Sequence, residues 1–462
     1  MQSTREKTIR RVLALLTLVI VGYGIYYVRE SASILAGYGA KVMCSCVYLS
    51  DRSPNHVLNN ELAGFPYSLA SYRVQKDKNS TTGSLFGLGK RRAVYREGIG
   101  CTLVPAGEDS TAIQAVPVVS KPEQPVNPDT LAWPYGDRLS SAFPSSVNRT
   151  KLEQTVNEVF TRNDKHTRAL LVVYKNELIA EQYADPFTRH TRQAGWSMSK
   201  SITNALVGYL VKNGKLSIAN KAPVDSWNRQ NDLRSQITIN HLLQMQSGLA
   251  WWEFYSAPSD VTRMLFTEAS AYQVATTARA EEVPGTDWYY ASGSTNVLMG
   301  ILRKTLGDSA YYRLPYEALF HPLGMYSARI EPDAAGNYVG SSYTMATARD
   351  WARFGLLFLN EGRWNEEQIL PESWVEYSHT PATHAPQGIY GAHFWLNAGE
   401  KNNPENRALP DVPADAYSAN GFEEQRIFII PSEELVVVRL GQTKGNFDFN
   451  RLLADIIDCL PR

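Results

Sequence analysis

Residues 195–201 read Gly-Trp-Ser-Met-Ser-Lys-Ser and place a serine and a lysine three positions apart where a helix is predicted to begin. Side chains at i and i+3 of a helix share one face, so the Lys200 amine can reach the Ser197 hydroxyl. A serine needs a neighbouring base to act as a nucleophile, and the positive end of a helix dipole favours an oxyanion. The spacing predicts a nucleophilic Ser197 activated by Lys200. The alternative is a capping serine one turn from a surface lysine.

Strand patterns lie on both sides of this segment, far apart in the sequence. Apolar runs at residues 169–174 and 178–183 predict one hairpin, and runs at 425–430 and 435–440 predict another. The stretches between the hairpins have helical periodicity, and helices are expected at residues 239–246, 296–306 and 348–359. A last helix is expected at residues 449–460, near the end of the chain. The order predicts an α/β (α+β) fold, in which one antiparallel sheet is flanked by helices and carries an inserted helical subdomain.

Two further segments contain side chains suited to the same chemistry. In residues 284–293, a proline and two glycines make a rigid turn that would hold Tyr290 in place just before Ser292. A tyrosine ionises near pH 10, so to act as a base it needs a cation beside it, and we expect Lys200 to supply that field. In residues 418–422, Asn420 and Gly421 would let a substrate approach an edge strand, where the Phe422 N–H can donate to an oxyanion.

Composition excludes several other classes of protein. Forty-six basic and 46 acidic residues give a formal net charge of zero, which argues against nucleic-acid binding by bulk charge. A mean hydropathy of −0.30 excludes a membrane protein with many spans. No cysteine or histidine cluster has the spacing of a zinc site, so no metal is expected.

Residues 12–28 form an uncharged apolar run that is long enough to cross a bilayer. Arg5, Lys7, Arg10 and Arg11 precede it, against Glu6 alone, which predicts a cytoplasmic N-terminus and an exported body. We therefore expect an uncleaved signal-anchor in the inner (plasma) membrane with a periplasmic catalytic domain. The alternative is a secreted protein whose signal peptide is cleaved near the small residues 31–33.

The chain is expected to divide into five parts. These are a cytoplasmic tail (1–11), a transmembrane anchor (12–28), a small N-terminal module (29–104), a proline-rich linker (105–145) and a large domain that contains Ser197 and Tyr290 (146–462). Export favours disulfides, and we expect Cys101 to pair with Cys44 or Cys46, whereas a bond within Cys44-Ser45-Cys46 would be strained. Buried thiols without a role are the alternative.

Together and in this order, the segments around Ser197, Tyr290 and Gly421 resemble the serine hydrolases related to class C β-lactamases and D-alanyl peptidases. The likeness is closer to the branch of esterases and 6-aminohexanoate-dimer hydrolases, and it covers about 150–462. Further blocks resemble that family: residues 238–243, 247–249, 321–325, 348–355 and 425–431.

The resemblance implies roles for individual residues. It makes Ser197 the nucleophile, Lys200 its activator and Tyr290 the residue that carries the proton to the leaving group. The Ser197 and Phe422 N–H groups would form the oxyanion hole, with Ser292, Asn420 and Gly421 beside the substrate. Ala419 stands where penicillin-recognising enzymes carry lysine or histidine, which disfavours a true β-lactamase.

These observations predict a membrane-anchored serine hydrolase that cleaves a small-molecule ester or amide through an acyl-enzyme, with no cofactor. The alternative is a non-catalytic peptidoglycan-binding or scaffold protein that keeps the fold. A binding module has no need of Ser197, Lys200 and Tyr290 together, and this argues for the enzyme.

Overall fold

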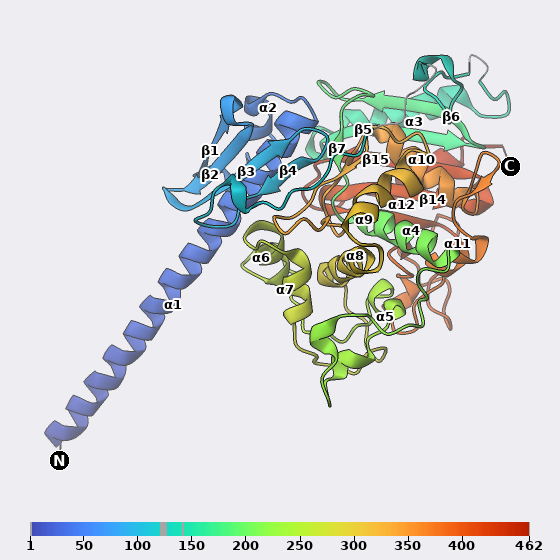
Figure 1. The fold of residues 1–462 in the computed structure, drawn as a ribbon. Helices are drawn as coiled ribbons and strands as arrows, with labels where there is room; N and C mark the ends of the chain where they lie inside the picture. The colour runs from blue at the N-terminus through green and yellow to red at the C-terminus, as the bar shows by residue number, and fades with distance from the viewer. Residues whose placement is uncertain (1, 121–126, 141–142, 462) are drawn as a thin grey trace.

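A computed structural model describes residues 2–120, 127–140 and 143–461 (Figure 1). One long helix, α1, extends from a compact body, in which a small four-stranded sheet lies beside a larger mixed domain. Met1 of the predicted cytoplasmic tail, and residues 121–126 and 141–142 of the predicted linker, lie outside the described residues.

The larger domain is built on a six-stranded sheet in the order β12-β13-β14-β15-β5-β6. Strands β5 and β15 pair antiparallel, with Val172 opposite Val437, so the two ends of the domain meet in the middle of the sheet. The predicted antiparallel sheet made from distant segments is confirmed. Its strands are β5 (Thr167–Tyr174), β6 (Glu177–Tyr183), β12 (Trp395–Leu396), β13 (Tyr417–Gly421), β14 (Gln425–Ile430) and β15 (Leu435–Gly441).

Helices cover both faces of this sheet because successive strand residues point to opposite sides. Leu171 and Val173 of β5 join the core beneath α4 (Ser199–Lys212), α8 (Ser292–Leu306) and α10 (Ala348–Leu359). Leu170 and Val172 face the other way, toward α3 (Arg149–Thr161) and α12 (Phe449–Ile457).

The remaining elements of this domain complete the inserted helical part and its edges. The helices are α5 (Ile239–Leu243), α6 (Asp260–Phe266), α7 (Ala271–Thr277), α9 (Asp308–Pro315) and α11 (Glu372–Ser378). Strands β7 (Gln193–Ala194), β8 (Arg329–Ile330) and β9 (Thr344–Ala346) form a small sheet, and β10 (Arg363–Trp364) pairs with β11 (Glu367–Gln368).

Helix α1 (Gln2–Cys44) continues without a break past Val28, where the sequence predicted the anchor to end. Its second half is rich in small residues, and the backbones of neighbouring elements approach it closely: a Cβ atom on Gly37 would lie 2.0 Å from the carbonyl oxygen of Phe266. Residues 12–28 are exposed, whereas Ala32 and Ala36 are fully buried. One helix therefore serves as both the apolar segment and the core of the N-terminal module.

The four-stranded sheet packs along this second half of α1 (Figure 1). Its strands follow in sequence order: β1 (Ala70–Gln75), β2 (Ser80–Leu85), β3 (Leu88–Arg96) and β4 (Gly100–Leu103). A disulfide joins Cys44 at the end of α1 to Cys101 in β4, which selects Cys44 over Cys46 as the partner of Cys101. Helix α2 (Pro54–Leu58) caps the same end of the module.

A buried ion pair fastens the module to the larger domain. The Lys41 ammonium of α1 contacts the Glu331 carboxylate, to which Ser45 also donates a hydrogen bond of 2.9 Å and the Cys101 N–H one of 2.6 Å. Both charged side chains are almost fully buried. Since an unpaired buried charge is costly, the pair and its hydrogen bonds hold the two parts in one arrangement.

Candidate active site

The Ser197 hydroxyl lies at a tight turn between strand β7 and helix α4. Residues Trp196–Met198 form a single 3₁₀ turn, and α4 begins at Ser199. Trp196 adopts φ +48°, a conformation that non-glycine residues rarely adopt. The turn therefore positions the hydroxyl at the start of the helix, as the sequence predicted.

Lys200 lies one turn further along and touches Ser197. Its ammonium nitrogen is 3.0 Å from the Ser197 hydroxyl oxygen, and also 3.0 Å from the Ser292 hydroxyl and the Ser341 carbonyl oxygen. Only 1 % of Lys200 is exposed. Burial disfavours the charged ammonium and lowers the pKa of Lys200 to about 8, against an opposing effect of the Glu253 charge. A large fraction of this amine is thus unprotonated in weakly alkaline solution.

His393 packs against the backbone of Lys200. Its Nδ1 is 2.9 Å from the Lys200 carbonyl oxygen, and its Nε2 is 3.2 Å from the Thr295 hydroxyl. Burial, and to a smaller extent the Lys200 charge, lower the pKa of His393 to about 3. The imidazole is neutral at pH 7 and fixes the helix without adding a charge to the site.

Glu253 is a site residue that sequence reasoning missed. Its carboxylate accepts hydrogen bonds from the Ser292 hydroxyl at 2.5 Å and the Ser292 N–H at 2.8 Å. It also accepts from the Trp251 indole at 2.6 Å and the Tyr255 hydroxyl at 2.8 Å. A single carboxylate within the aromatic run from Trp251 to Tyr255 was the available signal.

Ser292 occupies the position between Lys200 and Glu253. Its side chain is fully buried, accepts from the Lys200 ammonium and donates to the carboxylate. The sequence predicted it beside the substrate, and in the structure its hydroxyl lies between the Lys200 ammonium and the Glu253 carboxylate. Ser292 thus links the Lys200 amine to Glu253, which among the described residues is the only carboxylate hydrogen-bonded to Ser292.

Tyr290 lies next to both members of the Ser-Lys pair. The Lys200 nitrogen is 4.9 Å from the centroid of its ring, and its hydroxyl interacts with that of Ser197. The Tyr390 and Trp395 rings enclose it at centroid distances of 5.9 and 5.3 Å. Burial, then the Glu253 charge, raise the pKa of Tyr290.

The expectation that Lys200 would favour the ionised form of Tyr290 was therefore wrong. The Lys200 nitrogen lies over the ring, and the largest charge effect on the pKa of Tyr290 comes from Glu253, which raises it. Tyr290 remains a neutral phenol at pH 7 and can donate a proton.

The third segment reaches the same turn from strand β13. A Cβ atom on Gly421 would lie 2.1 Å from the Gly195 carbonyl oxygen, so only glycine permits this approach. The Phe422 ring then meets Trp196 edge-on at 5.9 Å and stacks on Tyr255 at 5.7 Å. Asn420 is half-buried and carries a buried Oδ1 without a hydrogen-bond partner in the structure. The structure thus brings Gly421, Phe422 and Asn420 to the Ser197 turn.

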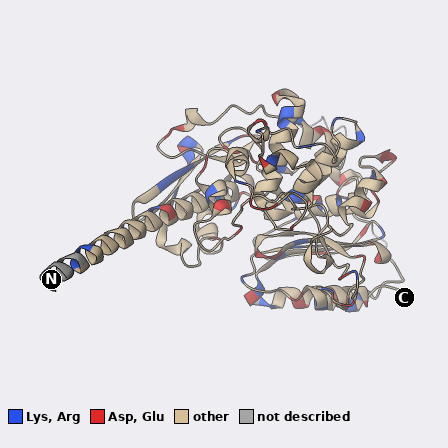
Figure 2. Ribbon diagram, turned by 90° about the horizontal axis from the view of Figure 1, so that it is seen from below, with Lys and Arg blue, Asp and Glu red and all other residues tan. Residues whose placement is uncertain are grey.

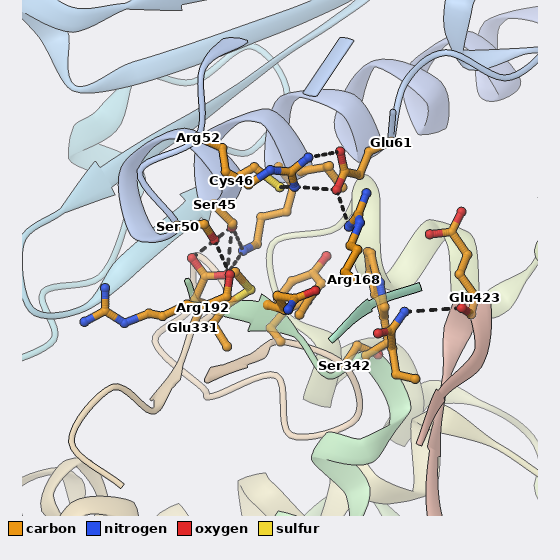
Figure 3. A pocket seen from close by; sticks show the side chains of 18 of the residues that line it. Ser45, Cys46, Ser50, Arg52, Glu61, Arg168, Arg192, Glu331, Ser342 and Glu423 are labelled. Carbon is orange, nitrogen blue, oxygen red and sulfur yellow. Dashed lines mark hydrogen bonds and ion pairs between the residues drawn. The ribbon is translucent and has the colours of Figure 1, made fainter. Parts of the chain in front are cut away.

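A cavity of about 50 Å³ lies beside this site, between the end of α1 and the larger domain (Figure 3). Trp196 and Glu423 line it, so it lies behind the nucleophile turn. Inside it, Arg52 and Arg168 both pair with Glu61 (Figure 3). Burial alone would raise the pKa of Glu61, but Arg168 and Arg52 lower it to about 2. The cavity separates two charge networks that bind the module to the body.

A metal site is not seen in the part of the chain that the structure describes, where no three His, Cys, Asp or Glu side chains are grouped to hold an ion.

Comparison with known proteins identifies related sequences. Across 327 residues the chain is 25 % identical to the 6-aminohexanoate-dimer hydrolase of Paenarthrobacter ureafaciens, covering 66 % of this chain and 76 % of that protein.

Solved structures share the fold at low sequence identity. A putative 6-aminohexanoate-dimer hydrolase from Bacillus anthracis superposes with a TM-score of 0.57 at 22 % identity, covering 73 % of this chain and 90 % of that one. A family VIII carboxylesterase gives 0.54 at 14 % identity, covering 70 % and 100 %. The sequence profile described as Beta-lactamase matches residues 152–459, most of the chain. The chain belongs to the beta-lactamase family.

Proposed function

We propose that this protein is a membrane-anchored serine hydrolase that cleaves an ester or amide bond through an acyl-enzyme on Ser197. Family membership indicates a hydrolase of the β-lactamase and esterase type. The observation that carries the finer proposal is the 3.0 Å contact between the Ser197 hydroxyl and the buried Lys200 amine. Burial that lowers the pKa of that amine makes it a base near neutral pH.

In the first half of the proposed reaction, Ser197 Oγ attacks the substrate carbonyl carbon while the unprotonated Lys200 amine accepts the hydroxyl proton. The main-chain N–H groups of Ser197 and Phe422 stabilise the negative oxygen that forms. Tyr290 donates its phenolic proton to the departing alcohol or amine as the carbonyl–heteroatom bond breaks. The proton held on Lys200 then passes to the Tyr290 oxygen and restores both groups.

In the second half, water attacks the acyl-enzyme carbonyl. Lys200 accepts a proton from that water through Tyr290 or directly, and the bond between the acyl carbon and Ser197 Oγ breaks. Oγ regains a proton from Lys200, and the carboxylic acid leaves. Glu253 and Ser292 act as positioning residues that hold Lys200 in line with Ser197.

Esters or amides are favoured over β-lactams at this site. Ala419 is 1 % exposed on β13 and supplies no cation for a β-lactam carboxylate. The relatives point the same way, since one is named for hydrolysis of the 6-aminohexanoate dimer and another is a carboxylesterase.

We propose that α1 remains attached and crosses the membrane, with the catalytic domain outside the cytoplasm. Within the described residues, only helix α1 is long and apolar enough to cross a membrane. Its apolar stretch has a mean hydropathy of 1.8, and none of it is buried. The helix runs unbroken through residues 31–33, where cleavage was the alternative, and Ala32 is fully buried. Cleavage there would cut α1 within the part that packs against the module.

A covalent probe and a substrate panel test the proposal. The full chain in detergent is treated with a fluorophosphonate, which we expect to attach to Ser197 as shown by peptide mass spectrometry. A separate, untreated sample is assayed on nitrophenyl esters of several chain lengths and on a chromogenic cephalosporin, and we expect the esters to be hydrolysed faster. Absence of both adduct and turnover would favour the non-catalytic peptidoglycan-binding alternative.

The pH dependence of the reaction follows from Lys200. Because burial lowers its pKa to about 8 and the unprotonated amine is the active form, kcat/KM is expected to rise about tenfold per pH unit below pH 8 and to level off above it. Initial rates on a nitrophenyl ester from pH 6 to 10, corrected for spontaneous hydrolysis, measure the profile. A flat profile across this range would contradict the role of Lys200 as base.

A further inference from the structure

Exposed apolar side chains surround α1 at the point where it leaves the body. They come from two segments: Phe86 and Leu88 at the β2–β3 turn, exposed by 77 % and 47 %, and Trp252 and Phe254 in the loop before α6, exposed by 52 % and 43 %. We call these four side chains the collar. Their position relative to the proposed membrane span is the basis of the inference.

The β2–β3 hairpin lies along α1 and points toward its apolar half (Figure 1). A Cβ atom on Gly83 would lie 2.4 Å from the Ala36 carbonyl oxygen, and one on Gly89 would lie 2.5 Å from the Ala32 carbonyl carbon. The turn lies about two residues beyond Gly89. At roughly 3.3 Å per strand residue and 1.5 Å per helix residue, its tip is level with about the end of the apolar run 12–28.

Phe86 adopts an unusual conformation for an exposed aromatic residue. It has φ +49° and is followed by Gly87 at +81°, a two-residue turn in which asparagine and glycine are preferred. A phenylalanine here gains little from packing, because most of its ring is exposed. An apolar surface outside the protein would account for its presence.

Helix α6 brings the second segment to the same level from another side of α1. The Arg263 guanidinium donates to the Glu30 carboxylate at 2.8 Å and to the Tyr26 hydroxyl at 3.1 Å. Phe266 lies against Gly37, so α6 runs in the same direction as α1 and its N-terminus is the end nearer the apolar run. Asp260 at that end accepts from the Trp252 N–H at 2.8 Å, which fixes the loop there.

Trp252 and Phe254 are stacked at 5.6 Å with an interplanar angle of 4°, and both remain exposed. Residues 12–28 of α1 carry no charge, and a long part of this helix is free of charged residues (Figure 2). Glu30 bonds to Arg263 of the body. Aromatic side chains beside a membrane-spanning helix are stable at the level of the lipid headgroups. The bilayer that α1 crosses is therefore the surface that fits the collar.

We propose that the collar rests in the headgroup layer of this membrane and brings the active site to esters or amides dissolved in the bilayer. This inference rests on the proposed function as an anchored hydrolase. The link to the site is Glu253, which lies between Trp252 and Phe254 in the chain. Its carboxylate accepts a hydrogen bond from the Ser292 hydroxyl. The loop that holds Glu253 therefore joins the collar to the active site, and the proposed substrate class is an ester or amide with a long apolar chain.

The variant Phe86→Asn with Leu88→Thr tests the collar without touching the active site. Asparagine suits the left-handed turn and threonine suits a strand, so the hairpin is retained while its apolar surface is removed. The control is Val118→Thr with Leu131→Thr, two exposed apolar residues elsewhere; Val118 lies against Gly98, at the opposite end of β3. The full chain is reconstituted in vesicles of equal parts phosphatidylcholine and phosphatidylglycerol.

Two substrates are compared: nitrophenyl acetate dissolved in water, and nitrophenyl palmitate dissolved in the vesicles. We expect the hairpin variant to keep its rate on acetate within about twofold and to lose about fivefold on palmitate, and the control to lose neither. If the unsubstituted chain hydrolyses neither ester, the proposed function fails. If it hydrolyses both and the hairpin variant equals the control on palmitate, the collar is overturned and the hydrolase stands.

A spin label gives a readout that does not depend on activity. Nitroxides are attached to Phe86→Cys and, in a separate variant, to Val118→Cys. The chain without an introduced cysteine is treated in the same way and measures the signal from labelling of Cys46. We expect the label at 86 to be relaxed by oxygen, which concentrates in lipid, and the label at 118 by a water-soluble nickel chelate. Relaxation of both by nickel, or shielding of the label at 86 from both agents by a second copy of the chain, would overturn the proposal.

Discussion

Replacing Ser197 with alanine is expected to lower kcat/KM on the best nitrophenyl ester by about 10,000-fold and to abolish fluorophosphonate labelling. The substitution removes the oxygen that forms the acyl-enzyme, and the Lys200 amine is too recessed to attack in its place, since only 1 % of it is exposed. Rates are measured on purified full-length chain at equal protein concentration, and the covalent probe counts the active sites of the unsubstituted chain.

Ser199→Ala is the matched control for this prediction. Ser199 lies two residues along the same turn, but its hydroxyl accepts from the Thr344 N–H at 3.0 Å and does not contact Lys200. We expect it to retain activity within about tenfold, with a loss of stability of about 1 kcal/mol from the missing hydrogen bond. Equal losses for the two variants would point to damage of the turn and contradict a specific role for Ser197.

Replacing Lys200 with methionine is expected to lower kcat/KM by about 1,000- to 10,000-fold, because the variant retains the nucleophile and loses its base. Methionine fills similar space, and removing a desolvated amine leaves the fold intact. Thermal unfolding checks the fold, and the rate of fluorophosphonate labelling reports the nucleophilicity of Ser197 separately from leaving-group protonation.

The pH profile adds a second readout for this variant. If Lys200 is the base, the rise of kcat/KM toward pH 8 should disappear in Lys200→Met, and the remaining activity should follow hydroxide alone. A variant that loses activity but keeps the rise near pH 8 would show that another group titrates, and Lys200 would then be a positioning residue.

The contacts that could be predicted from the sequence are those encoded by short spacings. Ser197 and Lys200 are one helical turn apart, so their contact follows once the helix is recognised. The meeting of β5 with β15 followed from strand patterns at both ends of the domain. These features depend on periodicity, which is local.

The electrostatics of the site could not be predicted in this way. Glu253 is 39 residues from Ser292 along the chain, and no spacing rule connects them. Its charge raises the pKa of Tyr290, whereas the sequence suggested that Lys200 would lower it. The choice of Cys44 over Cys46 likewise depends on which side of α1 meets β4, and this follows from packing of the small residues beyond Val28.

The unbroken α1 helix has a consequence for how the protein is made. The helix is the first part of the chain to leave the ribosome, yet the segments that pack against its second half are synthesised later. The disulfide partner of Cys44 follows after 57 residues, so the four-stranded sheet can close on the helix early. Glu331 follows Lys41 only after 290 residues, so this lysine lacks this partner until most of the chain has been synthesised. In the proposed topology, the late segments fold onto a helix that was inserted into the membrane first.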